Sequence, residues 1–296
     1  ENDRVFFRIN IAGKKTNPDF WMYVKERNYP LFEIDVDSVD SIGGIMLGFQ
    51  RAVAAIGYLW DICFVDQPAV EGYKTETRKV MKAVSGGEVK VPQAWGYSVY
   101  KSLKLHYGHL LESGIIPEAD LDNELKRLGF GRENAPALYA AIINILSSRP
   151  GFEAAEIAHF GSMPGGLKKI LERARYEIYT LGMKMPSKLG QRPDGNHSYH
   201  QNIEAGKPMW LSTFTMAQVL NQPDRVRFDP NLLKAQVIGT GASLNGVKRP
   251  AILIVFDQTA GESGPDAAVF FSRVAEILGT RSSSALTRKT GGVDFS

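Results

Sequence analysis

The spacing of apolar residues changes twice along this chain, and each change limits the folds that the chain can adopt. In residues 7–11 and 32–36, apolar residues alternate with polar ones, which is the period of a β-strand. The residues between them at 13–18 are rich in Gly, Asn and Pro, the composition of a turn. The start of the chain therefore predicts a β meander.

A helical spacing of apolar residues begins near Ser41 and opens the most apolar segment, residues 42–65. The segment is long enough to span a bilayer, but Gln50, Arg51 and Asp61 interrupt it. Because charges inside a membrane span are costly, we expect a helix buried in a protein core and no membrane partner.

The middle of the chain, from about residue 92 to residue 186, has helical spacing throughout. Four helices are expected here and would form a small helical bundle. They cover residues 97–111, 117–129, 134–146 and 166–181. Together with the meander, this bundle forms a predicted first region of residues 1–184.

A polar segment at residues 185–206 follows the bundle and is rich in Pro, Gly, Asn and His. It is too long for an ordinary connection, so it predicts a functional loop and a domain boundary. Strand character returns in the predicted C-terminal α/β portion, residues 207–281. There, residues 251–256 form an apolar run typical of a strand buried on both faces, and residues 265–278 predict a helix.

Two further segments complete the predicted fold. The run at 237–243 is typical of a strand that ends in a glycine-rich turn, and the polar tail at 282–296 is expected to be mobile. The predicted fold class is α+β, with an N-terminal β meander, a central helical bundle and a C-terminal β-α portion.

The cysteine content and the first residues bear on the expected location. Cys63 is the single cysteine, so an intrachain disulfide is excluded and an oxidising compartment is not indicated. Residues 1–4 lack the basic and apolar regions of a signal peptide. We therefore expect a cytoplasmic protein.

Basic and aromatic residues cluster in two stretches, residues 74–104 and 168–207, which carry local excesses of positive charge. Cations that neutralise phosphates, beside rings that stack on bases, are typical of a surface for single-stranded nucleic acid. The residues expected on it are Lys74, Arg78, Lys79, Lys82, Lys101, Lys104, Lys168, Lys169, Arg173, Arg175, Lys184, Lys188 and Arg192, with Tyr97, Tyr100, Tyr176 and Tyr179.

This pattern gives the leading functional hypothesis, a non-catalytic nucleic-acid-binding or assembly protein of coat or nucleocapsid type. Such a protein is expected to form homo-oligomers and to need no cofactor. The opposing interpretation is that the same residues are ordinary solvated helix faces, with tyrosines at the boundary of the core. A protein–protein adaptor is a third possibility, which the sequence does not separate from the first.

The polar segment supports a different hypothesis, a hydrolase or nuclease, with or without a metal, whose site includes residues 194–200, and the chain contains two His-x-x-His pairs. His197 and His200 lie in the polar segment near Asp194, and imidazoles at this spacing can bind zinc with a carboxylate as third ligand. His106 and His109 form the second pair, in the predicted helix 97–111. The simpler interpretation is surface histidines on an amphipathic helix and in a polar loop.

Overall fold

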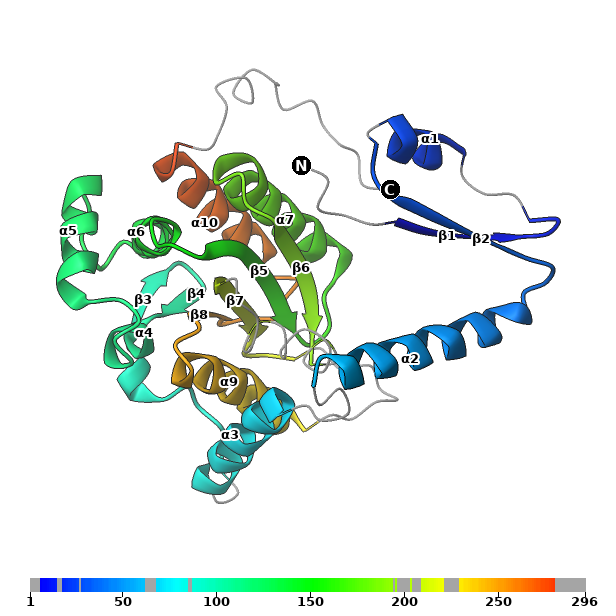
Figure 1. Ribbon diagram of the computed structural model, residues 1–296. Coiled ribbons are helices and arrows are strands. Elements are labelled where there is room, and N and C mark those ends of the chain that lie inside the picture. The colour runs from blue at the N-terminus through cyan, green and yellow to red at the C-terminus, as the bar shows by residue number, and fades with distance from the viewer. Residues whose placement is uncertain are drawn as a thin grey trace. The chain divides into compact units, whose positions relative to one another are not determined.

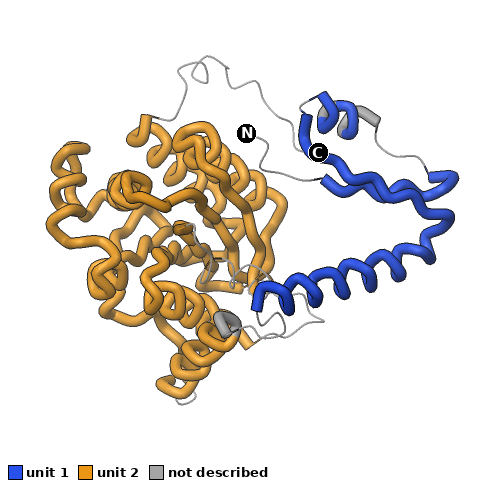
Figure 2. Tube along the Cα trace, viewed as in Figure 1, with its two compact units in different colours: residues 1–66 blue, residues 67–296 orange. Residues whose placement is uncertain are grey.

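The computed structural model describes residues 6–14, 18–26, 28–61, 68–84, 87–193, 195, 203, 209–220 and 229–279 (Figure 1). The chain divides into two compact units, residues 1–66 and residues 67–296 (Figure 2). Helices account for 51% and strands for 21% of the structure, which confirms the predicted α+β class.

The first unit contains two strands, β1 (Phe6–Ile11) and β2 (Leu31–Val36), with the helix α1 (Pro18–Glu26) between them. The prediction of strands at these places is confirmed. The prediction of a meander is wrong, because the strands pair in parallel, with Phe7 opposite Phe32. A connection that contains a helix is long enough to bring the chain back to the same end of the sheet.

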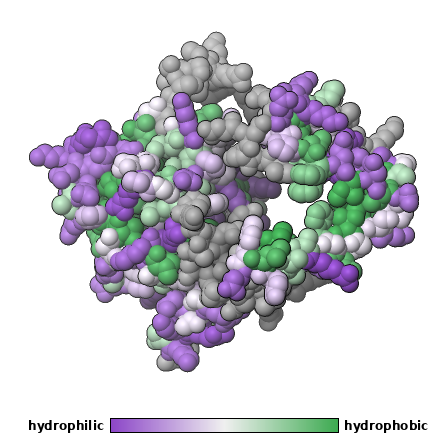
Figure 3. All heavy atoms as spheres, viewed as in Figure 1, coloured by the Kyte–Doolittle hydropathy of each residue, from purple (hydrophilic) through white to green (hydrophobic). Residues whose placement is uncertain are grey.

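The helix α2 (Ser41–Leu59) starts where the sequence predicts it. Of its nineteen residues Gly57 alone is buried, so the prediction of a buried core helix is wrong for this unit. Met46 and Val53 are more than half exposed, and Figure 3 shows apolar side chains gathered on the unit. Among the described helices, α2 is long and apolar enough to cross a membrane, by length and composition only.

The second unit is built on a six-stranded sheet with the order β3-β4-β8-β7-β5-β6. Strands β8, β7, β5 and β6 run parallel, whereas β3 and β4 form an antiparallel hairpin beside β8. The predicted strand at 251–256 is confirmed as β8. The strands are Tyr97–Tyr100 (β3), Leu103–His106 (β4), Phe152–Phe160 (β5), Ser187–Arg192 (β6), Met209–Ala217 (β7) and Ala251–Phe256 (β8).

Helices cover both faces of this sheet (Figure 1). One face packs against α6 (Ala135–Ser147), α7 (Gly165–Arg175) and α10 (Gly264–Ile277), and α5 (Glu118–Leu128) lies against α6. The opposite face packs against α3 (Pro68–Val84) and α9 (Pro230–Gly246). Three short elements are the 3₁₀ helix Gln93–Trp95, α4 (Gly108–Glu112) and the π-helix Tyr176–Gly182, which continues α7.

Three of the four helices predicted in the middle of the chain are confirmed, as α5, α6 and α7 with its π-helix. The predicted helix 97–111 is wrong: it is the hairpin β3–β4 followed by α4. Burial there follows the period of a strand, with Ser98, Leu103 and Leu105 buried and Tyr97 exposed. The predicted helical bundle is also wrong, because these helices pack on the sheet that contains β5.

The segment 237–243, predicted as a strand and turn, belongs to α9 instead. Its glycines allow α9 to lie very close to α3. A Cβ added to Gly239 would lie 2.6 Å from the backbone nitrogen of Thr77. Tertiary packing therefore outweighs the low helix propensity of glycine at this position.

The predicted domain boundary at 185–206 is not where the structure divides the chain. Both β6, which lies at its start, and β7, which follows it, pair with β5, so they belong to one sheet. The division falls after residue 66 instead. Residues 194, 196–202 and 204–208, and the predicted tail 282–296, lie outside the described residues.

Candidate functional site

The first predicted basic stretch lies on α3 and on the hairpin β3–β4. On α3, Lys74 pairs with Glu71 and Lys79 pairs with Glu76, both at 2.7 Å, so part of the positive charge is neutralised within the helix. Arg78 lies 3.9 Å from Glu71. Lys82 is exposed in the last turn of the same helix.

On the hairpin, each of the two lysines pairs with a carboxylate that follows β8 in the sequence. Lys101 pairs with Asp266 at 3.1 Å, and Lys104 pairs with Asp257 at 2.8 Å. The ring of Tyr97 is exposed, and the ammonium of Lys104 lies 5.9 Å from its centre. Tyr100 is half-buried and contacts the core, so it offers little surface to a base.

The second basic stretch lies on α7 and its π-helix. Arg173 pairs with Glu177 at 2.7 Å, and Arg175 pairs with Glu172. Lys168, Lys169 and Lys184 are exposed, and so is Tyr176. Within the described residues, Lys168 and Lys169 make no ion pair, so α7 begins with an excess of positive charge.

Two of the residues expected on a nucleic-acid surface are buried instead. Tyr179 is enclosed between sheet and helices, where its hydroxyl lies 2.6 Å from that of Tyr139. Arg192 is 2% exposed and binds Glu156. The prediction that these two side chains contact nucleic acid is wrong, since a ligand outside the protein cannot reach them. Lys188 is half-buried, near Arg192 and Glu156.

The two histidine pairs have different outcomes. Asp194, His197 and His200 lie outside the described residues, and within the described ones no three His, Cys, Asp or Glu side chains could hold a metal ion. His106 and His109 are buried, so the interpretation as surface histidines is wrong. His109 Nε2 lies 2.6 Å from the carbonyl oxygen of Ala251.

The parallel strands define one edge of the sheet at which several loops meet. Their order, β8-β7-β5-β6, places β6 on one side of β5 and β7 on the other. The helix after β5 packs on one face of the sheet, and the helix after β7 packs on the opposite face. In doubly wound proteins, ligands bind outside the carboxyl ends of the strands at such a reversal.

Gly161, the residue after β5, lies where the ends of three strands meet. Its amide donates to the carbonyl oxygen of Arg192, at the end of β6. A Cβ added to it would lie 3.2 Å from Leu233, at the start of α9, and 3.8 Å from Leu220, which follows β7. Its φ of +108° is one that favours glycine. We name this junction the carboxyl-edge site.

His159 holds the loop that leads from β5 into α7. Its Nδ1 lies 2.9 Å from Thr215 Oγ1 on β7, and its ring donates to the backbone of Ser162. Burial lowers the pKa of His159 to about 4, so the imidazole is neutral at pH 7. Sequence reasoning missed His159 and Thr215, because it did not predict β5 and so could not align the two strands.

The loop ends at the first turn of α7, which is suited to an anion. The turn contains Gly165 and Gly166, and a Cβ added to either would meet nothing within 4 Å. No acidic residue occupies this turn, and Lys168 and Lys169 follow directly. The first amide groups of a helix have no partner within the helix and carry a partial positive charge.

A buried polar cluster lies on the α9 face of the sheet. Arg192 Nη2 donates to Glu156 Oε2 at 2.8 Å, and Ser212 Oγ donates to Glu156 Oε1 at 2.9 Å. These side chains come from three neighbouring strands, β6, β5 and β7. Burial lowers the pKa of Lys188 to about 8, with help from the charge of Arg192 and against that of Glu156.

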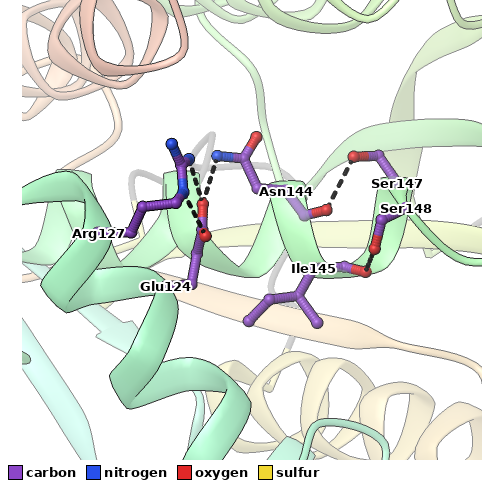
Figure 4. A network of polar contacts seen from close by, with 6 residues as sticks. All are labelled: Glu124, Arg127, Asn144, Ile145, Ser147 and Ser148. Carbon is purple, nitrogen blue, oxygen red and sulfur yellow. Dashed lines mark hydrogen bonds and ion pairs between the residues drawn. The ribbon is translucent and has the colours of Figure 1, made fainter.

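Another carboxylate network, between α5 and α6, is structural. Glu124 accepts from Arg127 Nη2 at 2.6 Å and from Asn144 Nδ2 at 2.8 Å, and it joins the two helices (Figure 4). The same residues line a shallow groove of about 770 Å³. Because Glu124 is fully engaged by these donors, its pKa is lowered, first by the bond from Arg127. A carboxylate held in this way is not suited to act as a base.

Comparisons with known proteins supply little beyond this geometry. No protein-family profile and no curated protein sequence matches the chain. A solved hypothetical protein from Thermus thermophilus is similar, with 11% identity, a TM-score of 0.35 and coverage of 92% of this chain and 55% of that chain. A glucose-6-phosphate isomerase from Chlamydia trachomatis has 9% identity, a TM-score of 0.39 and coverages of 93% and 65%.

The chain thus spans less than two thirds of the length of either solved protein. Both TM-scores are low, so neither similarity supports an argument about fold or function.

Proposed function

We propose that this chain binds a small anionic ligand at the carboxyl-edge site, as a ligand-binding or enzymatic domain. The observation that carries the proposal is the order β8-β7-β5-β6 of four parallel strands, which reverses between β5 and β7. In open parallel sheets this is the place where substrates and cofactors bind, because the loops there diverge and leave a crevice.

The chemistry of the first turn of α7 supports an anion as the ligand. Free amide groups at Gly165 and Gly166 and the positive end of the helix dipole favour a phosphate or a carboxylate. Lys168 and Lys169 add charge of the same sign within the next turn. A glycine pair allows a ligand to approach the backbone closely.

The alternative hypothesis is a hydrolase or nuclease with a site at Asp194, His197 and His200. These residues follow β6, which ends at Arg192, and they lie outside the described residues. This alternative therefore stays a proposal from the sequence.

Gly166→Asp tests the proposal by charge alone. An aspartate at this position would place a negative charge where the anion binds, and its Cβ would meet no neighbour within 4 Å. We expect inorganic phosphate or a small phosphomonoester to bind the parent chain, and binding to weaken at least about tenfold in the variant. Calorimetric titration at constant ionic strength measures both affinities.

Gly166→Asn is the matched control, because asparagine has nearly the shape of aspartate without its charge. It should bind phosphate as the parent chain does. Equal affinity in the Asp and Asn variants would contradict the proposal, and so would the absence of binding to any phosphate, sulfate or carboxylate probe.

A second candidate is binding of single-stranded nucleic acid. It is favoured by the exposed ring of Tyr97 beside Lys104, and by Tyr176 near the cations of α7. Binding through these groups should weaken steeply with salt, and Tyr97→Ala with Tyr176→Ala should lower the affinity for an oligonucleotide about tenfold or more. Fluorescence anisotropy at two salt concentrations measures this. Salt-independent binding, or none, would refute this candidate.

A further inference from the structure

The helix α2 carries a continuous apolar stripe that the described residues of its own unit leave largely open. Apolar residues recur along it at alternating intervals of three and four residues, which is the spacing of the contact positions in a two-stranded coiled coil. Leu59, near the end of the stripe, is 77% exposed. We name this stripe the α2 seam, and it consists of Ile42, Ile45, Phe49, Ala52, Ile56 and Leu59.

The polar residues in the middle of α2 lie off the seam. Gln50 and Arg51 are exposed and follow Phe49 directly, so the helical rotation turns both side chains away from the seam. In a lipid bilayer, α2 would carry Arg51 near the middle of the hydrocarbon, where a charge is costly. In a pair of helices, the same side chain can stay in water. The position of Arg51 therefore favours a protein partner over a lipid bilayer.

The apolar surface continues from the seam onto the sheet of the same unit. The ring centre of Phe49 lies 5.6 Å from that of Phe7, and Phe7 stacks on Phe32 with 5.3 Å between their centres. Phe7 and Phe32 are both more than half exposed. Together with the seam, these rings expose roughly 600 Å² of apolar surface, which is at the upper limit for a monomeric protein. Two copies joined through it would bury about 1,200 Å², the lower limit for a stable interface.

The seam is complementary to itself when two copies run antiparallel. If Phe49 faces Ala52 of the partner subunit, the ring meets the smallest residue of the seam. The same register places Ile45 against Ile56 of the partner subunit, and Ile42 against Leu59 of the partner subunit. Large residues then face small ones at the centre, as in layers that interdigitate. A twofold axis repeats each contact, which is the property of an isologous dimer.

We propose that α2 is the dimerisation element of this chain, and that its partner is α2 of a second copy, packed antiparallel through the seam. The exposed rings of Phe7 and Phe32 extend the apolar contact beyond the helix pair. All the residues involved belong to the first unit, so the dimer is independent of the carboxyl-edge site in the second unit.

Sedimentation velocity of the full chain tests the proposal. We expect a species of twice the mass of one chain at about 100 µM, with dissociation on dilution, because the interface is at the lower limit of area. Ile56→Glu should weaken the dimer at least about tenfold, since the twofold axis places two buried carboxylates in the seam. A parent chain that is monomeric at this concentration would overturn the proposal.

Leu47→Glu is the matched control. Leu47 is 48% exposed, compared with 44% for Ile56, and it lies on the opposite side of α2. The same substitution there should leave the dimer unchanged, and circular dichroism should show equal helix content in both variants. Equal weakening of the dimer by the two variants would contradict contact through the seam.

Disulfide trapping tests the direction of the helices. In a Cys63→Ser background, which removes the single native cysteine, Ile42→Cys and Leu59→Cys chains are mixed and oxidised. We expect a cross-linked dimer in the mixture and none in either variant alone, because the antiparallel register joins residue 42 to residue 59. Cross-linking of each variant with itself would overturn the antiparallel arrangement.

Flotation with vesicles of neutral phosphatidylcholine separates the dimer from a lipid-bound form. We expect the parent chain to stay below the vesicles, because the seam is covered by the second copy. A monomeric chain that floats with the vesicles, and no longer does so after Ile56→Glu, would assign the seam to lipid and overturn the proposal.

Discussion

Glu156→Gln should lower the free energy of unfolding by about 3–5 kcal/mol, the typical cost of breaking a buried ion pair. Arg192 and Glu156 are almost completely buried, and their side chains meet at 2.8 Å. In the variant, the guanidinium would stay charged in the interior and would lose the carboxylate of Glu156. Urea denaturation, monitored by circular dichroism, measures the change.

Glu276→Gln is the matched control, since Glu276 pairs with Arg273 at 2.9 Å on the exposed surface of α10. An exposed pair contributes about 0–1 kcal/mol, so this variant should be close to the parent chain. Replacing Glu156 and Arg192 together by methionine, with Ser212→Ala, should recover much of the stability, because no charge is then left without a partner. Similar stabilities for the Glu156 and Glu276 variants would contradict the buried position of the pair.

The sequence predicted the elements whose residues repeat with a clear period. The strand at Ala251–Phe256 was predictable because its apolar run is continuous, and α5 and α6 because of their helical spacing. β5 was not predicted, since its alanines have no preference for strands and Glu156 and His159 interrupt the apolar pattern. Without β5, the middle of the chain resembled a bundle rather than one layer of a sheet.

The carboxyl-edge site depends on strand order, which no local pattern encodes. Gly161 and Leu220 are far apart in the sequence, and only the parallel pairing of β5 with β7 brings them together. Arg192 and Glu156 are also brought together by strand pairing. In the sequence alone, Arg192 resembles a basic residue of a solvated face and Glu156 an ordinary carboxylate. Local charge counts therefore overestimated the exposed positive surface.

Acid should destabilise the second unit well above the pH at which its carboxylates titrate. His106, His109 and His159 are buried, and burial lowers the pKa of each from 6.5 to about 4. Between these values the unfolded chain binds more protons than the folded chain, so stability is full above pH 6.5 and falls as the pH drops toward 4. From pH 7 to pH 5, each histidine should lower the free energy of unfolding by about 1.8 kcal/mol, and the three together by about 5.5 kcal/mol.

Variants assign this loss to individual histidines, because all other titrating groups cancel in the comparison with the parent chain. In His109→Gln the amide nitrogen can replace Nε2 as donor to Ala251, and in His159→Asn the amide can replace Nδ1 beside Thr215. Each variant should reduce the slope of stability against pH near pH 5.5 by about one proton, or about 1.4 kcal/mol per pH unit. An unchanged slope would mean that the replaced imidazole has the same pKa in the folded and unfolded chains. That outcome would contradict the lowered pKa, because a buried imidazole keeps its ordinary pKa only where a nearby negative charge compensates for burial.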